Sequence, residues 1–260
     1  MNKESARGSP PALFVSDLHL DASRPDAIRD FVAFLRGPAR SASALYVLGD
    51  LFDAWLGDEQ LREALPASIS QEFAALAASG VPVYIQQGNR DFLLGKRFAS
   101  ASGATLLPDV VVHDLHGTPT LIMHGDLLCT DDVDYQRFRA FTRSAGPQRV
   151  WNALPYAWRR NLAQRLRARS RDATAVKLPS IMDVNAAAVE GAMRQNKVTR
   201  LIHGHTHRPA CHRLNFDGKH AERWVLGDWY ARGSYLEVAA DGIRAHPLGG
   251  DEAPHRTPPG

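Results

Sequence analysis

Five short apolar runs in this chain each end in a cluster of Gly, Asp, Asn or His. The runs occupy residues 13–15, 44–48, 81–85, 120–123 and 200–202. Short apolar runs bounded by glycine and polar residues are typical of buried β-strands. Helical stretches at residues 25–36 and 59–79 separate the first three runs, so strand and helix alternate. This alternation predicts an α/β fold with a largely parallel sheet and right-handed crossovers.

Residues from about 131 to 196 break this pattern. They are predicted to be helical, and Pro147, Pro155 and Pro179 divide them into pieces. We interpret them as an insertion between two core strands. β structure is predicted again at residues 210–216, 222–226 and 233–238. The sequence therefore predicts a single domain over residues 1–247, and a disordered tail over residues 248–260, which are rich in glycine and proline.

The composition indicates a globular protein without a disulfide framework, a signal peptide or a membrane-spanning helix. The chain is 44% hydrophobic and 23% charged, which is ordinary for a globular domain, and its two cysteines are too few for a disulfide framework. Residues 1–12 contain no apolar segment of the kind found in signal peptides. No apolar run approaches the roughly 18 residues that a membrane-spanning helix needs. We therefore expect an intracellular protein whose association with any membrane is peripheral.

The predicted insertion concentrates positive charge. Ten arginines and no acidic residue lie between Arg137 and Arg171: positions 137, 139, 143, 149, 159, 160, 165, 167, 169 and 171. The whole chain has a net charge of +3, so the remainder carries −7. Such a basic segment favours an anionic partner, which leaves nucleic acid, a phosphate-bearing substrate and acidic lipid headgroups as alternatives.

The polar clusters at the strand ends contain seven candidate metal ligands. These are Asp17, His19, Asp50, Asn89, His124, His205 and His207. Oxygen and nitrogen ligands without thiolates suit Mn, Fe, Co or Zn. Asp17 and His19 are two residues apart, so on an extended backbone their side chains would project to the same side. A carboxylate such as Asp50 can bridge two cations about 3.5–4 Å apart, the separation used for phosphoryl displacement.

As a set, these clusters resemble the signature of the calcineurin-like metallophosphoesterases over roughly residues 13–239. The motifs are Asp17-Leu18-His19, Gly49-Asp50-Leu51-Phe52-Asp53, Gly88-Asn89-Arg90-Asp91, His124-Gly125-Asp126 and Gly204-His205-Thr206-His207. The resemblance implies an αββα sandwich with a helical lid insertion. It also implies two divalent metal ions, Mn²⁺ by family preference, and a bridging hydroxide. One ion would take Asp17, His19, Asp50 and His207; the other would take Asp50, Asn89, His124 and His205.

Longer stretches of sequence resemble one family within that group, the UDP-2,3-diacylglucosamine diphosphatases of lipid A biosynthesis. They are Ser-Asp-Leu-His-Leu (16–20), Gly-Asp-Leu-Phe-Asp-Ala-Trp (49–55), Gln-Gly-Asn-Arg-Asp-Phe-Leu-Leu-Gly (87–95), His-Gly-Asp-Leu-Leu-Cys-Thr-Asp-Asp (124–132) and Ile-Met-Asp-Val-Asn (181–185). The resemblance implies hydrolysis of the substrate's pyrophosphate to UMP and 2,3-diacylglucosamine 1-phosphate, with attack on the α-phosphorus.

The same resemblance assigns site residues by position. The catalytic set would be Asp50, Asn89, Arg90, His124 and His205. The substrate contacts would be Asn89, Arg90, Asp132, Ser170, Thr174, Lys177 and His205. Thr174 departs from the family, which more often has Asn at that position. We expect Asp126 and Asp53 to orient ligands and loops. We expect Cys129 to be structural, and His203 either to be structural or to support a ligand.

The insertion mixes its arginines with aromatic and aliphatic side chains, as an amphipathic lid over acyl chains would. A solvated arginine-rich helix packed on the core is the alternative. Tyr135, Phe138 and Trp55 are candidates for lining a sugar or acyl pocket, and ordinary core packing is the alternative for each. We expect a monomer without a nucleic-acid partner, bound peripherally at the cytoplasmic face of the inner membrane. Two other hypotheses remain: a soluble metallophosphoesterase acting on another nucleotide or a phosphoprotein, and a non-enzymatic scaffold.

Overall fold

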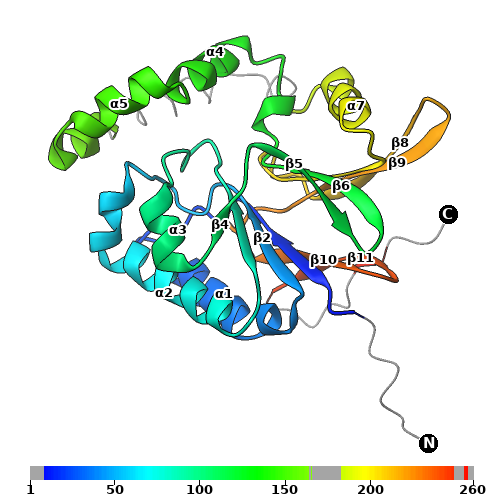
Figure 1. Cartoon of the computed structure of the whole chain (residues 1–260), viewed down its shortest axis with the longest axis horizontal. Coiled ribbons are helices and arrows are strands. Elements are labelled where there is room, and N and C mark those ends of the chain that lie inside the picture. The colour runs from blue at the N-terminus through cyan, green and yellow to red at the C-terminus, as the bar shows by residue number, and fades with distance from the viewer. Residues whose placement is uncertain (1–8, 164, 166–182, 249–254, 257–260) are drawn as a thin grey trace, which may run out of the picture.

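Two β-sheets pack face to face, and helices cover the outer face of each sheet (Figure 1). The structure is a computed structural model that describes residues 9–163, 165, 183–248 and 255–256. The layers run helix, sheet, sheet, helix, which confirms the expected αββα sandwich. All five apolar runs form strands, namely β1, β2, β3, β6 and β7.

The first sheet has the strand order β12-β11-β10-β1-β2-β3-β4. Its strands are β1 (Ala12–Val15), β2 (Ala44–Leu48), β3 (Val83–Gln86), β4 (Thr105–Leu106), β10 (Ser234–Ala239), β11 (Gly242–Pro247) and β12 (His255–Arg256). Strands β1 to β4 are parallel, whereas β10 to β12 join antiparallel to them. Within the tail that we expected to be disordered, His255–Arg256 therefore pair with β11.

The second sheet has the strand order β5-β6-β7-β9-β8. Its strands are β5 (Val110–Leu115), β6 (Thr118–Met123), β7 (Arg200–His203), β8 (Ala210–Phe216) and β9 (Lys219–Val225). Only β6, β7 and β9 run parallel to one another. The expectation of one largely parallel sheet is thus wrong. Because β5 follows β4 without a crossover helix and pairs antiparallel with β6, the chain starts a new sheet there.

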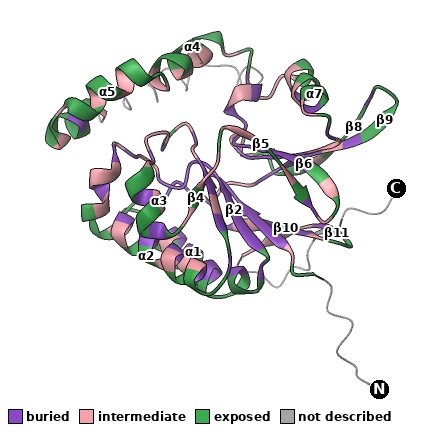
Figure 2. Cartoon of the chain, in the orientation of Figure 1, coloured by how far each residue is buried: buried purple, intermediate pink, exposed green. Residues whose placement is uncertain are grey.

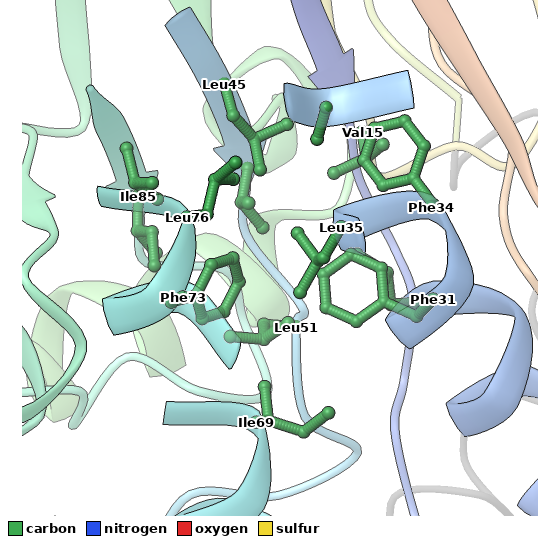
Figure 3. Packing of buried hydrophobic residues seen from close by; sticks show 14 of the residues in the cluster. Val15, Phe31, Phe34, Leu35, Leu45, Leu51, Ile69, Phe73, Leu76 and Ile85 are labelled. Carbon is green, nitrogen blue, oxygen red and sulfur yellow. The ribbon is translucent and has the colours of Figure 1, made fainter. Parts of the chain in front are cut away.

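Alternating side chains build the packing of the first sheet. Phe14 and Tyr46 point into the space between the sheets, where their rings stack at 4.5 Å. Leu13, Val15 and Leu45 point the opposite way, toward helices α1 (Pro25–Arg36) and α2 (Ala64–Ala78). Figure 3 shows aromatic and aliphatic side chains of these helices closing over the strands. This period of two is what a strand buried on both faces requires.

Shorter elements complete the fold. Helix α3 (Lys96–Ser102) packs beside α2, and α7 (Ala186–Gln195) covers the second sheet through Val189 and Met193. The described part of the chain also contains the 3₁₀ helices η1 (Pro38–Ser41), η2 (Asp58–Arg62) and η3 (Asp126–Leu128).

The helical insertion lies in the chain between β6 and β7. It contains α4 (Val133–Thr142), α5 (Ala145–Ala153), a helical stretch at residues 156–163 and α7. Helices α4 and α5 form an arm that extends over the core (Figure 1). Among the described helices, none combines the length and the apolar composition needed to span a bilayer.

Candidate metal centre

The seven predicted ligands lie beyond the carboxyl ends of strands from both sheets. Asp17, Asp50 and Asn89 follow β1, β2 and β3 of the first sheet. His124 and His205 follow β6 and β7 of the second sheet. The two sheets meet with these ends adjacent, since the His205 amide, after β7 of the second sheet, donates to Asp17 Oδ2, after β1 of the first, at 2.8 Å. Sequence-distant ligands therefore converge on one edge of the sandwich.

The backbone at five of the seven ligands is left-handed, not extended. The φ angles are +54° at Asp17, +46° at His19, +51° at Asp50, +70° at His205 and +55° at His207. The extended-backbone argument for Asp17 and His19 is therefore wrong, although both side chains still reach the site. Non-glycine residues with positive φ are uncommon and cluster at functional sites, where surrounding structure holds them.

Two glycines let the ligand loops approach one another. A Cβ atom at Gly88 would lie 2.1 Å from Asp50 Oδ1, and one at Gly204 would lie 2.3 Å from Asp17 Oδ2. Both distances are far below van der Waals contact. Any side chain at either position would push a carboxylate out of the site, which explains why these motifs place glycine beside the ligands.

Asp17, His19 and His207 form one group of donor atoms. His207 Nε2 lies 3.3 Å from Asp17 Oδ1 and 3.4 Å from His19 Nε2. Asp17 and His19 are almost completely buried. Three donors of this type within 4.8 Å of one another could hold a metal ion.

His124, His205 and Asn89 form a second group around a shared oxygen. Asn89 Oδ1 lies 2.9 Å from His124 Nε2 and 2.9 Å from His205 Nδ1. His124 Nδ1 donates to the Leu48 carbonyl at 2.7 Å, so Nε2 is the ring nitrogen that faces the site and could bind a metal once deprotonated. Asp50 lies between the two groups, with Oδ2 3.8 Å from His19 Nδ1 and Oδ1 3.9 Å from His124 Nε2.

Burial and crowding displace the pKa values of the ligands. Burial raises the pKa of Asp50 to about 7, opposed by the charge of His124 and reinforced by Asp91 and Asp17. Burial lowers the pKa of His19 to about 3 and that of His205 to about 4, so both imidazoles are neutral at pH 7. Burial also acts to raise the pKa of Asp17, but the adjacent His207 ring and the charges of His124 and His207 hold it well below its usual range.

The donor atoms fit a pair of cations. Asp17 Oδ1 and His19 Nδ1 are buried and have no hydrogen-bond partner among the described residues. Such atoms are costly to bury without a partner, and a bound cation would supply one. Buried carboxylates beside neutral imidazoles form the oxygen and nitrogen set that Mn, Fe, Co and Zn accept.

Sequence reasoning gave no role to three further residues at the site. Asp91 is buried and accepts hydrogen bonds from the amides of Gly88, at 2.7 Å, and Leu51, at 2.8 Å, which joins the loops after β2 and β3. Asp228 Oδ2 lies 3.4 Å from His207 Nδ1. Tyr230 stacks on His19 with ring centroids 5.0 Å apart. Asp228 follows β9 in a Gly-Asp-Trp cluster, the same strand-end signal that marked the other ligands.

We expect Asp228→Asn to lower metal affinity by about 10- to 100-fold, because a carboxylate behind a histidine orients the ring and raises its basicity. Equilibrium dialysis against Mn²⁺ measures the change. Asp217→Asn is the control, since Asp217 is an exposed carboxylate paired with Arg194. Equal Mn²⁺ affinity in the Asp228 variant and in the wild type would show that His207 does not depend on this contact.

The structure describes only some of the predicted substrate contacts, and these lie in different places. Arg90 is partly exposed beside the ligands, where its amide donates to Asp50 Oδ1 at 2.8 Å and its guanidinium pairs with Asp53 at 3.0 Å. Asp132 caps α4 by accepting the Tyr135 amide. Ser170, Thr174 and Lys177 lie outside the described residues.

The remaining predictions concern residues near the site. Trp55 is buried in the core, so the packing alternative holds for it. Tyr135 donates to Asp126 Oδ2 at 2.7 Å and lies against the His205 ring, whereas Phe138 is exposed. His203 is buried and Cys129 is buried with a pKa raised to about 12 by desolvation, as expected of structural residues.

Among the arginines of this segment that the structure describes, three bind the core instead of facing a partner. Arg139 pairs with Asp126 at 2.7 Å and with Asp109 at 2.6 Å. Arg143 pairs with Asp109 at 2.8 Å, and Arg159 pairs with Glu59 at 2.7 Å. These contacts fasten α4 and the helical residues 156–163 to the sandwich, so these three arginines are not free to bind an anionic partner.

Comparison with known proteins agrees with this geometry. The family model described as calcineurin-like phosphoesterase matches residues 10–209. UDP-2,3-diacylglucosamine hydrolase of Serratia proteamaculans is 50% identical, over 89% of this chain and 96% of the relative. The hydrolases of the same name from Pseudomonas aeruginosa and Escherichia coli are also 50% identical, covering 91% and 89% of this chain and 98% and 96% of theirs. With the ligands converging as described, this chain belongs to the calcineurin-like phosphoesterase family.

Proposed function

We propose that this protein hydrolyses the pyrophosphate of UDP-2,3-diacylglucosamine to UMP and 2,3-diacylglucosamine 1-phosphate, a reaction of lipid A biosynthesis. The observation that carries the proposal is the convergence of seven oxygen and nitrogen donors at one sheet edge. It is supported by half-identity, over about nine-tenths of the chain, to hydrolases named for that substrate.

In this proposal Asp17, His19, Asp50 and His207 hold one divalent cation, and Asp50, Asn89, His124 and His205 hold the other, with Mn²⁺ as the native ion. Two such cations lower the pKa of a bound water and neutralise charge on the phosphoryl oxygens. Arg90 orients the phosphates, since its guanidinium can form paired hydrogen bonds with them. Asp132, Ser170, Thr174 and Lys177 bind the sugar part of the substrate.

Detergent-solubilised UDP-2,3-diacylglucosamine tests the proposal directly. The Mn²⁺-loaded protein is expected to release UMP, and in ¹⁸O-labelled water the label is expected in UMP, because attack falls on the α-phosphorus. Label in the sugar phosphate would place the attack on the other phosphorus. If the protein hydrolysed only water-soluble nucleotides or phosphoproteins, UDP-2,3-diacylglucosamine would not be its substrate.

We further propose that the insertion rests on an anionic membrane at the cytoplasmic face of the inner membrane, with the protein acting as a monomer and binding no nucleic acid. Six large apolar side chains are exposed on α4, α5 and residues 156–163: Val133, Phe138, Phe141, Val150, Trp158 and Leu162. Three arginines on the same helices are exposed as well, namely Arg137, Arg149 and Arg160. The outer sides of α4 and α5 are largely exposed in Figure 2.

One side of α4 contacts the core, and the other side is exposed. Arg139 and Arg143, one turn apart, point to core carboxylates, whereas Phe138 and Phe141 are 53% and 65% exposed. An amphipathic helix whose apolar side lacks protein contacts can bury that side in the interface of a bilayer, and nearby arginines add attraction to anionic lipids. This separation favours a lipid surface over a purely solvated helix.

The double variant Phe141→Ser/Trp158→Ser is expected to bind vesicles containing phosphatidylglycerol at least about tenfold more weakly, since burying each ring contributes about 1.5–3 kcal/mol. Vesicle sedimentation measures the loss. Val112→Ser is the matched control, because Val112 is the exposed apolar residue of β5. If both proteins sediment equally, the insertion does not dock on the membrane through these residues.

A further inference from the structure

A cavity of about 200 Å³ lies beside the ligand cluster, on the face of the second sheet that also packs against α7. It is lined by Asp183, Thr206, Arg208, Pro209, Ala210, His212, Arg223 and Val225. Thr206 stands between the ligands His205 and His207 in sequence, so the cavity adjoins the metal centre. Two arginines, Arg208 and Arg223, line it, and neither belongs to the metal centre.

Arg223 is the buried cation of this cavity. Its side chain is nine-tenths buried, and Nη1 donates to His203 Nε2 at 3.2 Å. His203 Nδ1 donates to the Gly204 carbonyl at 2.8 Å, so the ring meets Arg223 with its other nitrogen as an acceptor and brings no negative charge. Among the described residues, no carboxylate lies within ion-pair distance of Arg223 and no second acceptor binds its guanidinium. A buried guanidinium ordinarily has a paired anion, so this one lacks its charge partner.

The other groups of the cavity complete a site for an anion. Arg208 pairs with Asp183 at 2.5 Å, and these two charges cancel. His212 lies directly across the β8–β9 ladder from Arg223, whose charge adds to burial in lowering the histidine pKa. The single positive charge of Arg223 therefore remains, with the Thr206 hydroxyl as a neutral donor and Pro209, Ala210 and Val225 as apolar walls.

We propose that this cavity binds a phosphate group, either inorganic phosphate or the phosphate of a nucleotide monoester, through the guanidinium of Arg223. Guanidinium forks bind phosphate oxygens with two parallel hydrogen bonds, which a carboxamide cannot reproduce. The cavity volume accommodates a phosphate ion, and its opening beside the metal centre places a bound phosphate near the reaction. The site is independent of the lipid substrate proposed above.

Titration of the metal-free, full-length protein tests the proposal, because chelation removes the cations that would otherwise bind phosphate. Isothermal titration calorimetry with inorganic phosphate, UMP and uridine supplies the readout. Wild type is expected to bind phosphate and UMP, but not uridine. Tighter binding of UMP than of phosphate would identify the nucleotide as the source of the phosphate, and equal binding would identify free phosphate.

Arg223→Gln is expected to weaken binding of phosphate by about tenfold or more. Arg208→Ala is expected to weaken it as well, since the variant leaves the Asp183 charge uncompensated in the cavity. Arg194→Ala is the matched control, because Arg194 is also a half-exposed arginine paired with an aspartate, but lies outside the cavity. Thermal unfolding verifies the fold of each variant, and Arg208→Ala carries the test if Arg223→Gln does not fold.

The proposal fails if metal-free wild type shows no saturable phosphate binding. It also fails if the folded Arg208 and Arg223 variants bind phosphate as wild type does while Arg90→Ala does not, since the phosphate would then lie at the metal centre. Neither outcome bears on the release of UMP from the lipid substrate, which depends on the metal ligands and is measured separately.

Discussion

Asp50→Asn is expected to abolish metal-dependent hydrolysis, with kcat falling about 10³-fold or more. Asp50 directs one oxygen toward His19 and the other toward His124, so it is the carboxylate between the two donor groups. A carboxamide of the same shape lacks the charge needed to bridge two cations. Losing a cation removes several kcal/mol of transition-state stabilisation, which corresponds to at least this factor in rate.

The loss of activity should coincide with a loss of metal. Mass spectrometry after dialysis against Mn²⁺ measures ions per chain, and the variant should hold fewer than the wild type. Asp26→Asn is the control, because Asp26 is an exposed residue of α1 paired with Arg29. Full metal content with normal kcat in the Asp50 variant would exclude a bridging role.

Without metal, the stability of wild type and that of Asp50→Asn are also expected to depend differently on pH. The pKa of Asp50 is raised from 3.8 to about 7 in the folded state, so the folded state holds this proton more tightly than the unfolded state. The corresponding stability is present below about pH 4 and is lost as the pH rises to about 7. Wild type should therefore lose more free energy of unfolding than Asp50→Asn across this range, as urea denaturation can measure. Parallel curves would contradict the raised pKa.

Arg139→Met is expected to lower the free energy of unfolding by about 3 kcal/mol and to loosen α4. Arg139 is 11% exposed, and its guanidinium bridges Asp126, which is 2% exposed, and Asp109. Removing it leaves Asp126 with the Tyr135 hydroxyl and with Arg143 at 3.8 Å. Breaking a buried ion pair by deleting one partner typically costs 3–5 kcal/mol, because the remaining charge stays desolvated.

Urea denaturation measures the loss, and hydrogen exchange locates it. Faster exchange is expected in α4 because Arg139 pairs this helix with Asp126 and Asp109. Arg137→Met is a close control: it makes the same chemical change on an exposed residue of the same helix, two positions away. Equal stability of the two variants would show that the Asp126 pair contributes nothing to holding the arm.

Sequence reasoning failed where partners are far apart in the chain. Strand β5 and helix α3 were missed because β5 is half-exposed, with His113 and Asp114 within it, and α3 has only seven residues. The arginines of α4 read as a free basic face because Asp109 lies 30 residues before Arg139. Asp228 and Tyr230 escaped notice because only the folded chain brings them to His207 and His19.

The sequence by itself determined the strands β1, β2, β3, β6 and β7, the helical insertion and the set of seven donor residues. These are local properties: apolar runs that end in polar clusters identify strands and their carboxyl ends without reference to the rest of the chain. Tertiary structure decided how those ends meet, because two separate sheets and five left-handed ligand residues bring the donors within reach of one another. It also decided which arginines bind the core and which remain exposed, since that depends on the partners that packing places beside each one.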